Sequence, residues 1–445
     1  MSPNECRKNV VVLSPNYVGH LNRWLPLAQH YADNGYRICF GGDKDLVRFT
    51  IKNKFKLYPL KTIPITFSHC PTNYTGLKKW FFKFRERINI AVLFEQRSTE
   101  LIQLLADLKP EIIFIDSFYY ADFIVLYPHI EPSKIVFLGA SFAKHFSPVV
   151  PPINTGASVR EHSEHLWKKE FKKIKRKAFF DNIRYLGQSE QNIVATYFKK
   201  QNIPAQYALN YQRLWPHLPN NMAEWNILPK ELDFKEQQLL PWQKYIHLPI
   251  PTNRVEYVSD AVKDFINTQG NNPLIYVSMG TVIHLKKVAN KLSTQNFNIE
   301  SLLNTFIDVA VQNPNYSFII NVDKLDIQSN TKNVLLMNFA PQLYILKKAA
   351  VFCTHAGGNS ILEAIHFGVP MLLLGIEGKE WAGHATRAAH HGLGIKCDHR
   401  ANESTMAVNI NELLKNPIYK TNLSNMANQL ANDNHSQNLI SYATN

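Results

Sequence analysis

Short runs of apolar residues alternate along this chain with longer segments whose apolar residues recur every three or four positions. The first run, Asn9–Ser14, ends in a polar loop; the segment after it stops near Gly35 and leads into a second run at Arg37–Phe40. The runs predict buried strands and the periodic segment predicts an amphipathic helix. Strand, loop, helix and strand in this order predict a doubly wound α/β domain, which binds ligands where its strands end.

The same alternation recurs in the second half of the chain. Pro273–Thr281 predicts a buried strand that ends in a small polar turn, followed by a helix at Ile299–Gln312 and a strand at Tyr316–Val322. Val351–Leu374 contains a strand, a polar turn with two glycines, an amphipathic helix, and a second strand after Gly-Val-Pro. We interpret it as a βαβ unit.

The composition indicates a globular protein with a basic surface. Hydrophobic residues make up 45% and charged residues 19%, and a length of 445 residues suggests roughly two or three domains. The net charge of +14 suits an anionic ligand, an anionic membrane surface or nucleic acid, and does not choose among them. Much of the excess lies in 78–87 and 168–177.

The cysteines and the apolar runs indicate a cytoplasmic protein. The five cysteines form no C-x-x-C pair, so neither a disulfide scaffold nor a zinc ribbon is expected. A reducing cytosol fits this pattern best. The sequence contains no apolar run of about 18 residues, and its first residues lack the apolar region of a signal peptide.

The turn of the βαβ unit carries the residues that most strongly indicate a ligand. Gly357 and Gly358 allow the backbone to approach a ligand closely, and Asn359 and Ser360 stand where helix N-caps are expected. A helix start presents unpaired N–H groups and the positive end of a dipole, so it favours a phosphate. His355 adds a donor before the turn. The alternative is an ordinary turn whose polar residues only cap the helix.

Two further side chains suggest acid–base chemistry. His20, in the loop after the first strand, is a candidate general base for a hydroxyl proton. Asp116 ends a buried strand at the same sheet edge, where its carboxylate can orient the imidazole. Each has a plainer alternative as a cap of the helix that follows it.

Glu363 lies one turn further into the helix of the βαβ unit, where its carboxylate can accept protons from two hydroxyls, such as those of a ribose. The combination H-x-G-x-N-S-x-x-E followed by G-V-P resembles the nucleotide-sugar donor signature of the GT-B glycosyltransferases. The resemblance is to the family that includes plant UDP-glycosyltransferases and bacterial macrolide glycosyltransferases. It implies two facing Rossmann-like domains with the active site in the cleft between them.

The segment P-x-x-x-G-H-L-N-x-x-x-P-L-A around His20 looks like the N-terminal loop of this family, whose histidine deprotonates the acceptor. Asp116 stands at the place of the aspartate that partners that histidine. Both residues are therefore implied to be catalytic.

Further segments resemble the donor site of the family: Y-V-S-M-G-T, N-F-A-P-Q, and E-W in place of the usual D-Q. The donor-binding residues implied by the resemblance are Ser278, Gly280, Thr281, Phe339, Ala340, Gln342, His355, Gly357, Gly358, Asn359, Ser360, Glu363, Glu380 and Trp381.

Three departures from the family pattern concern the donor. Phe339 replaces the tryptophan that stacks on uracil, and Gly358 stands where plant members carry tryptophan. Glu380 and Trp381 replace the pair that holds the sugar hydroxyls, which favours a deoxysugar, an N-acetylated sugar or another variant over glucose. The choice between a uridine and a thymidine donor stays open.

The resemblance also implies the domain limits. L-P-K-E-L-D-F resembles the end of the family's N-terminal domain, so we expect an acceptor-binding domain at 1–250 and a donor-binding domain at 251–430. We expect residues 431–445 to form a helix that returns to the first domain.

Two basic segments of the first domain have open roles. The segment 56–97 is predicted to be irregular and rich in aromatic residues; it lines the acceptor pocket, packs as a surface helix, or lies on a bilayer. The helix predicted around 167–177 has Phe171, Ile174 and Phe179 as an apolar stripe, which is typical of a solvated amphipathic helix.

The sequence therefore indicates an inverting transfer of a sugar from a nucleotide diphosphate sugar, by the resemblance a UDP-sugar, to a hydroxyl of a small hydrophobic acceptor. Two alternatives are the same fold glycosylating a lipid at the inner face of the membrane, and an inactive nucleotide-sugar-binding subunit. We expect no metal ion or other cofactor, because no acidic D-x-D pair stands near the donor site. We expect no nucleic-acid partner, since net charge alone would favour one.

Overall fold

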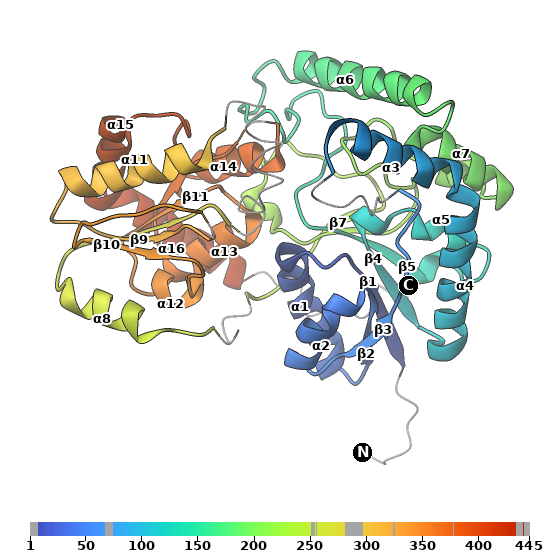
Figure 1. Cartoon of the computed structure of the whole chain (residues 1–445), viewed down its shortest axis with the longest axis horizontal. Coiled ribbons are helices and arrows are strands. Elements are labelled where there is room, and N and C mark those ends of the chain that lie inside the picture. Colours follow the sequence, from blue (N-terminus) through green and yellow to red (C-terminus); the bar gives the residue numbers. More distant parts are fainter. Residues whose placement is uncertain are drawn as a thin grey trace.

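The computed structural model describes residues 8–66, 74–250, 254, 256–280, 297–323, 325–376, 378–432 and 439. Its strands form two parallel sheets, one in each half of the chain, and helices lie on both faces of each sheet (Figure 1). The prediction of two doubly wound α/β units is confirmed.

Within the described residues, the N-terminal sheet has seven strands in the order β3-β2-β1-β4-β5-β6-β7. The strands are β1 Asn9–Leu13, β2 Arg37–Gly42, β3 Lys56–Pro59, β4 Ile112–Asp116, β5 Ile135–Gly139, β6 Glu224–Asn226 and β7 Gln243–Tyr245. The strand order reverses between β1 and β4, which pair in register from Val10 with Ile112 to Leu13 with Ile115. Such a reversal opens a crevice at the carboxyl ends of the two strands.

The helices of this half cover both faces of its sheet. They are α1 Val18–Asp33, α2 Val47–Lys52, α3 Gly76–Ile88, α4 Ile90–Leu108, α5 Asp122–Leu126, α6 Ser163–Arg184 and α7 Glu190–Lys200. Short 3₁₀ turns are η1 Lys44–Leu46, η2 Ser117–Tyr119, η3 Pro132–Lys134, η4 Ala205–Tyr207 and η5 Lys230–Leu232.

The prediction of irregular structure for 56–97 was wrong. Its described residues contain β3, all of α3 and the start of α4. β3 pairs with β2, and α4 buries Phe94, Leu101 and Leu104 against the sheet. Local sequence hides these elements because β3 is an edge strand and α3 buries none of its side chains.

In the described part of the C-terminal half, six strands follow the order β10-β9-β8-β11-β12-β13. The strands are β8 Leu274–Ser278, β9 Ser317–Asn321, β10 Val334–Met337, β11 Val351–Thr354, β12 Met371–Leu373 and β13 Gly394–Lys396. The helices are α8 Asp260–Thr268, α11 Ile299–Gln312, α12 Gln342–Leu346, α13 Gly358–Phe367, α14 Glu380–His390, α15 Glu403–Lys415 and α16 Ile418–Ala431. The helix predicted at Ile299–Gln312 is confirmed at both ends; Asn298 caps it by accepting from the Ser301 N–H at 3.1 Å.

The two halves meet through the segment between β7 and α8, which contains the predicted boundary at residue 250. Near the C-terminus, Leu439 is fully buried in the core of the N-terminal sheet, and its carbonyl accepts from the Tyr31 hydroxyl at 3.2 Å. The other residues after Asn432 lie outside the described residues, so the helix predicted at 431–445 stays a prediction. No helix in the described part of the chain combines the length and apolar character needed to cross a membrane.

Candidate active site

His20 and Asp116 meet where the N-terminal strand order reverses. His20 lies in the first turn of α1, directly after β1, and Asp116 is the last residue of β4. The two are hydrogen bonded, with His20 Nδ1 2.7 Å from Asp116 Oδ2. Since the carboxylate can only accept a hydrogen bond, Nδ1 carries the proton and donates it. The other ring nitrogen, Nε2, therefore has a free lone pair and can accept a proton. The arrangement is that of a general base with an orienting carboxylate.

Asp116 is held by more than the histidine. Its side chain is fully buried, Oδ2 also accepts from Trp24 Nε1 at 3.0 Å, and Oδ1 accepts from the Phe118 N–H at 2.9 Å. Asp116 thus caps the following 3₁₀ turn with one oxygen and binds His20 with the other. His20 itself caps no helix, since the residue at the N-cap of α1 is Tyr17.

An aromatic wall adjoins His20, formed by Tyr17, Phe118 and Trp215. The Phe118 ring centroid lies 4.8 Å from those of both His20 and Trp215, and Tyr17 approaches His20 edge-on at 5.8 Å. Trp215 Nε1 donates to Glu190 at the start of α7 at 3.1 Å. Sequence reasoning missed this wall because its rings come from three separate segments.

His355 lies in the turn after β11, and two glycines make room for its ring. A Cβ at Gly280 would be 2.4 Å from His355 Cε1, and a Cβ at Gly357 would be 2.6 Å from Nε2. The imidazole is largely buried, and Trp381 meets it edge-on at 5.1 Å. Gly280 and Gly357 therefore accommodate a side chain of the same site, in addition to any approach of a ligand.

The prediction that Asn359 and Ser360 stand at N-cap positions was wrong. α13 begins at Gly358 with Gly357 as its N-cap, so Asn359 and Ser360 already lie inside the first turn. The side chain of Asn359 donates to the Gly19 carbonyl, beside His20, at 3.0 Å. The start of α13 is thereby fixed against the first turn of α1, which carries the candidate base.

Glu363 is buried in α13 and is bound by two residues. Arg254, in the segment between the halves, lies 3.1 Å from Oε1 through Nη1, and Gln342 Nε2 donates to Oε2 at 2.6 Å. Burial raises the pKa of Glu363, although Arg254 opposes that shift. Sequence reasoning missed Arg254, because its role depends on a contact across 109 positions.

Arg23 occupies the space in front of Gly358. This arginine of α1 is buried, and its Nη1 donates to the Ile227 carbonyl at 2.8 Å. A Cβ at Gly358 would be 2.6 Å from Arg23 Nη2. Arg23 thus fills the space that a side chain would need at this position, where plant members of the family carry tryptophan. Burial lowers the pKa of Arg23 to about 10, which keeps the guanidinium charged at neutral pH.

A small pocket lies between the halves at this point. It is bordered by α1, by the segment after β7 and by α13, and its lining includes Arg23, Arg254, Asn359 and Glu363. Two guanidinium groups and a buried carboxylate thus share one cavity with the start of α13.

Glu380 and Lys144 form an ion pair between the halves. Lys144 Nζ lies 2.8 Å from Glu380 Oε2. Burial disfavours the charged carboxylate, but Lys144, His384 and His20 together outweigh this effect and hold the pKa of Glu380 at about 2. Trp381, next in sequence, is half-buried against the C-terminal core.

The remaining predicted donor residues differ in accessibility. Phe339 is two-thirds exposed after β10, whereas Ala340 is buried. Ser278, at the end of β8, is buried, and its Oγ accepts from the Gly280 N–H at 3.4 Å. Thr281 lies outside the described residues.

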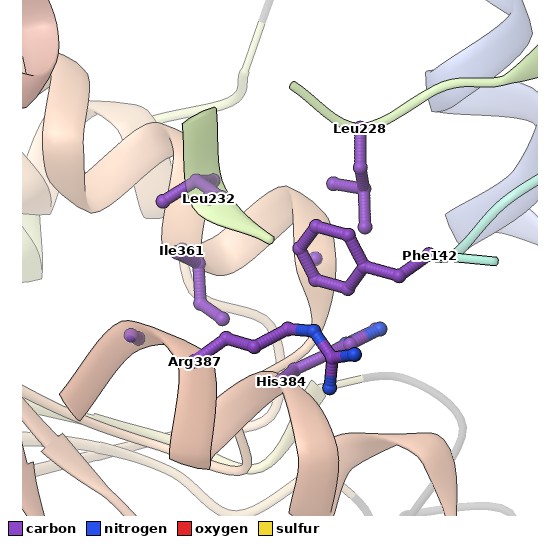
Figure 2. A pocket seen from close by; sticks show the side chains of 8 residues that line it. Phe142, Leu228, Leu232, Ile361, His384 and Arg387 are labelled. Carbon is purple, nitrogen blue, oxygen red and sulfur yellow. The ribbon is translucent and has the colours of Figure 1, made fainter. Parts of the chain in front are cut away.

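Buried polar contacts behind the start of α13 join the halves. Figure 2 shows Phe142 and Leu228 facing His384 and Arg387 around a small pocket. Arg387 Nε lies 2.5 Å from Asp233 Oδ1. His384 Nδ1 donates to the Ala356 carbonyl at 3.2 Å, and its Nε2 accepts from Ser141 Oγ at 2.8 Å. Burial lowers the pKa of His384 to about 4, so this imidazole is neutral at pH 7.

The chain is similar to several glycosyltransferases in sequence. Nuatigenin 3-beta-glucosyltransferase of Solanum aculeatissimum is 28% identical over 158 residues, which are 35% of this chain and 31% of the relative. The ecdysteroid UDP-glucosyltransferase of Autographa californica nuclear polyhedrosis virus is 25% identical over 386 residues, 80% of this chain and 66% of the relative. Other matches are shorter: the chain spans 19% and 28% of the length of two putative UDP-glucuronosyltransferases of Caenorhabditis elegans.

The fold is that of solved GT-B glycosyltransferases. The glycotransferase of kitacinnamycin superposes with a TM-score of 0.71 at 16% identity, over 99% of this chain and 98% of that one. The calicheamicin glycosyltransferase CalG4 gives a TM-score of 0.65 at 14% identity, over 99% of both chains.

The sequence model of the family described as UDP-glucoronosyl and UDP-glucosyl transferase matches residues 192–437, more than half of the chain. This region contains the whole described C-terminal sheet and α13. It also contains His355, in the turn before α13, and Asn359, in the first turn of α13. The family match agrees with the fold of two parallel sheets and with the site residues that lie between the two halves. The chain belongs to the UDP-glucoronosyl and UDP-glucosyl transferase family.

Proposed function

We propose that this protein is an inverting glycosyltransferase that moves a sugar from a nucleotide diphosphate sugar, a UDP-sugar by family, to a hydroxyl of a small hydrophobic acceptor. The observation that carries the proposal is the His20–Asp116 hydrogen bond of 2.7 Å, placed beside the start of α13. A base that faces a helix start belonging to the other half of the chain suits a reaction between two substrates, one bound to each half.

In this reaction His20 Nε2 removes the proton of the acceptor hydroxyl while the hydroxyl oxygen attacks the anomeric carbon. The bond between that carbon and the diphosphate oxygen breaks on the opposite side, so a single displacement inverts the anomeric configuration. Asp116 stabilises the imidazolium that forms and keeps Nδ1 protonated throughout.

The leaving diphosphate needs positive groups, and the cavity between the halves offers several. The start of α13 contributes backbone N–H groups, and Arg23 and Arg254 contribute two guanidinium groups. We assign the diphosphate to His355, Asn359, Ser360 and the turn at Ser278–Gly280, and the ribose to Glu363. These groups supply the charge compensation that a divalent cation would otherwise give, so we propose that no metal is required.

The acceptor is proposed to lie against the aromatic wall of Tyr17, Phe118 and Trp215. Flat aromatic faces next to the base favour an apolar acceptor that carries a hydroxyl. Two relatives are named as glucosyltransferases of nuatigenin and of ecdysteroids, which agrees with a small acceptor.

We propose uridine as the base of the donor. The family and the ecdysteroid relative favour a UDP-sugar, whereas two structural neighbours were solved with thymidine diphosphate. Glu380 stands where the family carries the acidic residue that holds the sugar hydroxyls, so we assign the sugar hydroxyls to Glu380. Trp381 packs against His355 and acts through that ring.

The proposal is tested by thermal shift and slow nucleotide release across a panel of UDP- and dTDP-sugars. We expect one donor to raise the melting temperature of the wild type and of His20→Ala, and Glu363→Ala to lose that shift. We expect nucleotide release to fall in both variants. Asp260→Asn, an exposed residue on α8, is the matched control.

Three outcomes would contradict the proposal. If no nucleotide sugar stabilises the wild type, the donor assignment is wrong. If a donor binds but His20→Ala transfers sugar to an acceptor panel as fast as wild type, the base assignment is wrong. Binding with no transfer or hydrolysis by the wild type would favour an inactive nucleotide-sugar-binding subunit, which the intact His20–Asp116 pair argues against.

A further inference from the structure

Helices α3 and α6 expose apolar side chains that the core does not cover. None of the residues of α3, all of them described, is buried, and Leu77 and Phe81 are 84% and 61% exposed. In α6, Phe179 is 62% exposed and Ile183 60%. The predicted stripe of α6 was therefore wrong at Phe179: Phe171 and Ile174 pack on the core, but Phe179 points to solvent.

The two helices are joined near their C-terminal ends, on the N-terminal half. Figure 1 shows α6 above α3, both on the side of this half away from β3 and α2. Arg87 of α3 donates to the Gln188 carbonyl just after α6, and its guanidinium lies over the Tyr185 ring at 4.2 Å. We call the exposed surface of the two helices the α3/α6 face. Its exposed apolar residues are Leu77, Trp80, Phe81, Ile88, Phe179, Phe180, Ile183 and Leu186.

The α3/α6 face is also strongly basic. The two helices contain thirteen Lys or Arg residues and four acidic residues, so they carry +9 of the chain's net +14. Lys172 and Lys175 are exposed on the same helix as Phe179. Cations interleaved with exposed aromatic and aliphatic side chains are typical of a helix that lies in the interface of a bilayer.

We propose that the α3/α6 face docks on an anionic lipid bilayer. The apolar side chains would enter the headgroup region while Lys and Arg bind the lipid phosphates. A second copy of the chain is a poor occupant, because two such faces would repel each other. Nucleic acid would satisfy the cations but leaves Leu77, Ile88, Ile183 and Leu186 without a role, since aliphatic side chains do not stack on bases.

The position of the face suits an acceptor that arrives from the membrane. Glu190, two residues after Gln188, accepts from Trp215 of the aromatic wall and from the Tyr120 hydroxyl at 2.7 Å. The segment 188–190 therefore links the end of the α3/α6 face to the wall beside His20. The docking inference itself does not depend on the proposed transferase activity, because its test measures binding.

The test is cosedimentation of the full chain with vesicles of phosphatidylcholine alone or with about 30 mol% phosphatidylserine, at about 0.05 and 0.5 M salt. We expect binding to the anionic vesicles only, weakened at high salt. Leu77→Ser with Phe81→Ser, and separately Lys172→Glu with Lys175→Glu, should each lower the partition coefficient by about tenfold or more. All four positions are exposed, so the fold should survive, which circular dichroism checks.

Two matched double variants serve as controls on the C-terminal half. Val311→Ser with Val408→Ser removes apolar side chains of similar exposure, and Lys347→Glu with Lys348→Glu reverses two exposed lysines. Both should bind vesicles like the wild type. The proposal is overturned if the wild type does not bind anionic vesicles at low salt, or if the controls lose as much as the face variants. It is also overturned if Leu77→Ser with Phe81→Ser binds normally while poly(U) competes, which would identify a nucleic-acid surface.

Discussion

Lys144 Nζ lies 2.8 Å from Glu380 Oε2, and this ion pair joins the N-terminal half to the first turn of α14. Glu380 of this ion pair belongs to the E-W sequence that replaces the family's usual D-Q. A cation of the opposite half thus orients Glu380, and no family motif in the sequence predicts this contact.

The first prediction follows from the pKa of Glu380. Its folded-state value of about 2 lies below its ordinary value of 4.5, so the pair's contribution to stability is fully present above about pH 4.5 and is lost as pH falls towards 2. Lys144→Met should therefore lower the free energy of unfolding by about 1 kcal/mol at pH 6, a modest figure because both groups are partly solvated.

Urea unfolding at pH 6 and pH 3 measures this difference. At pH 3 the difference in free energy of unfolding between wild type and Lys144→Met should become smaller. Lys347→Met, which changes an exposed lysine, should unfold with the same free energy as wild type at either pH. An equal gap at both pH values would contradict the assignment of the effect to an ion pair.

Asp116→Asn should remove most of the activity. The single amide oxygen cannot accept at both ends: if it accepts from the Phe118 N–H, the amide NH2 faces His20 Nδ1 and Trp24 Nε1, and the imidazole loses its productive tautomer. We expect kcat to fall by about a thousandfold or more with the donor's KM nearly unchanged. Steady-state kinetics with the donor that the thermal-shift panel identifies measures kcat and KM, with Asp260→Asn as control. A fall of less than tenfold in kcat would show that Asp116 does not orient the base.

Gly358→Ala should strain the contact with Arg23. The added Cβ would lie 2.6 Å from Nη2 of a guanidinium that the Ile227 carbonyl holds in place. We expect a loss of about 1–3 kcal/mol in the free energy of unfolding. Because Arg23 is the clashing group, the loss in Gly358→Ala should shrink when Arg23→Ala is also present. Strictly additive effects in this double-mutant cycle, read by urea unfolding, would rule out the clash as the cause.

Asp233→Asn should be among the most destabilising single changes. It leaves the buried guanidinium of Arg387 without its anion, for an expected cost of about 3–5 kcal/mol. Replacing both partners, Asp233→Leu with Arg387→Met, should recover part of that loss, since no buried charge remains. Differential scanning calorimetry compares the variants with Asp260→Asn, whose exposed ion pair should contribute little to stability. Equal losses in the Asp233 and Asp260 variants would contradict this account.

The sequence by itself determined the two α/β units and the helix at Ile299–Gln312, because apolar periodicity is a local property. Strand-end position together with the family resemblance identified His20 and Asp116 as partners. Only the tertiary structure decided which residue caps α13 and that α3 buries none of its side chains. It alone brought Arg23 and Arg254 into the cavity beside Glu363, and Lys144 to Glu380. These contacts join residues far apart in the chain, and their energy depends on burial and charge in the folded protein, which no local pattern records.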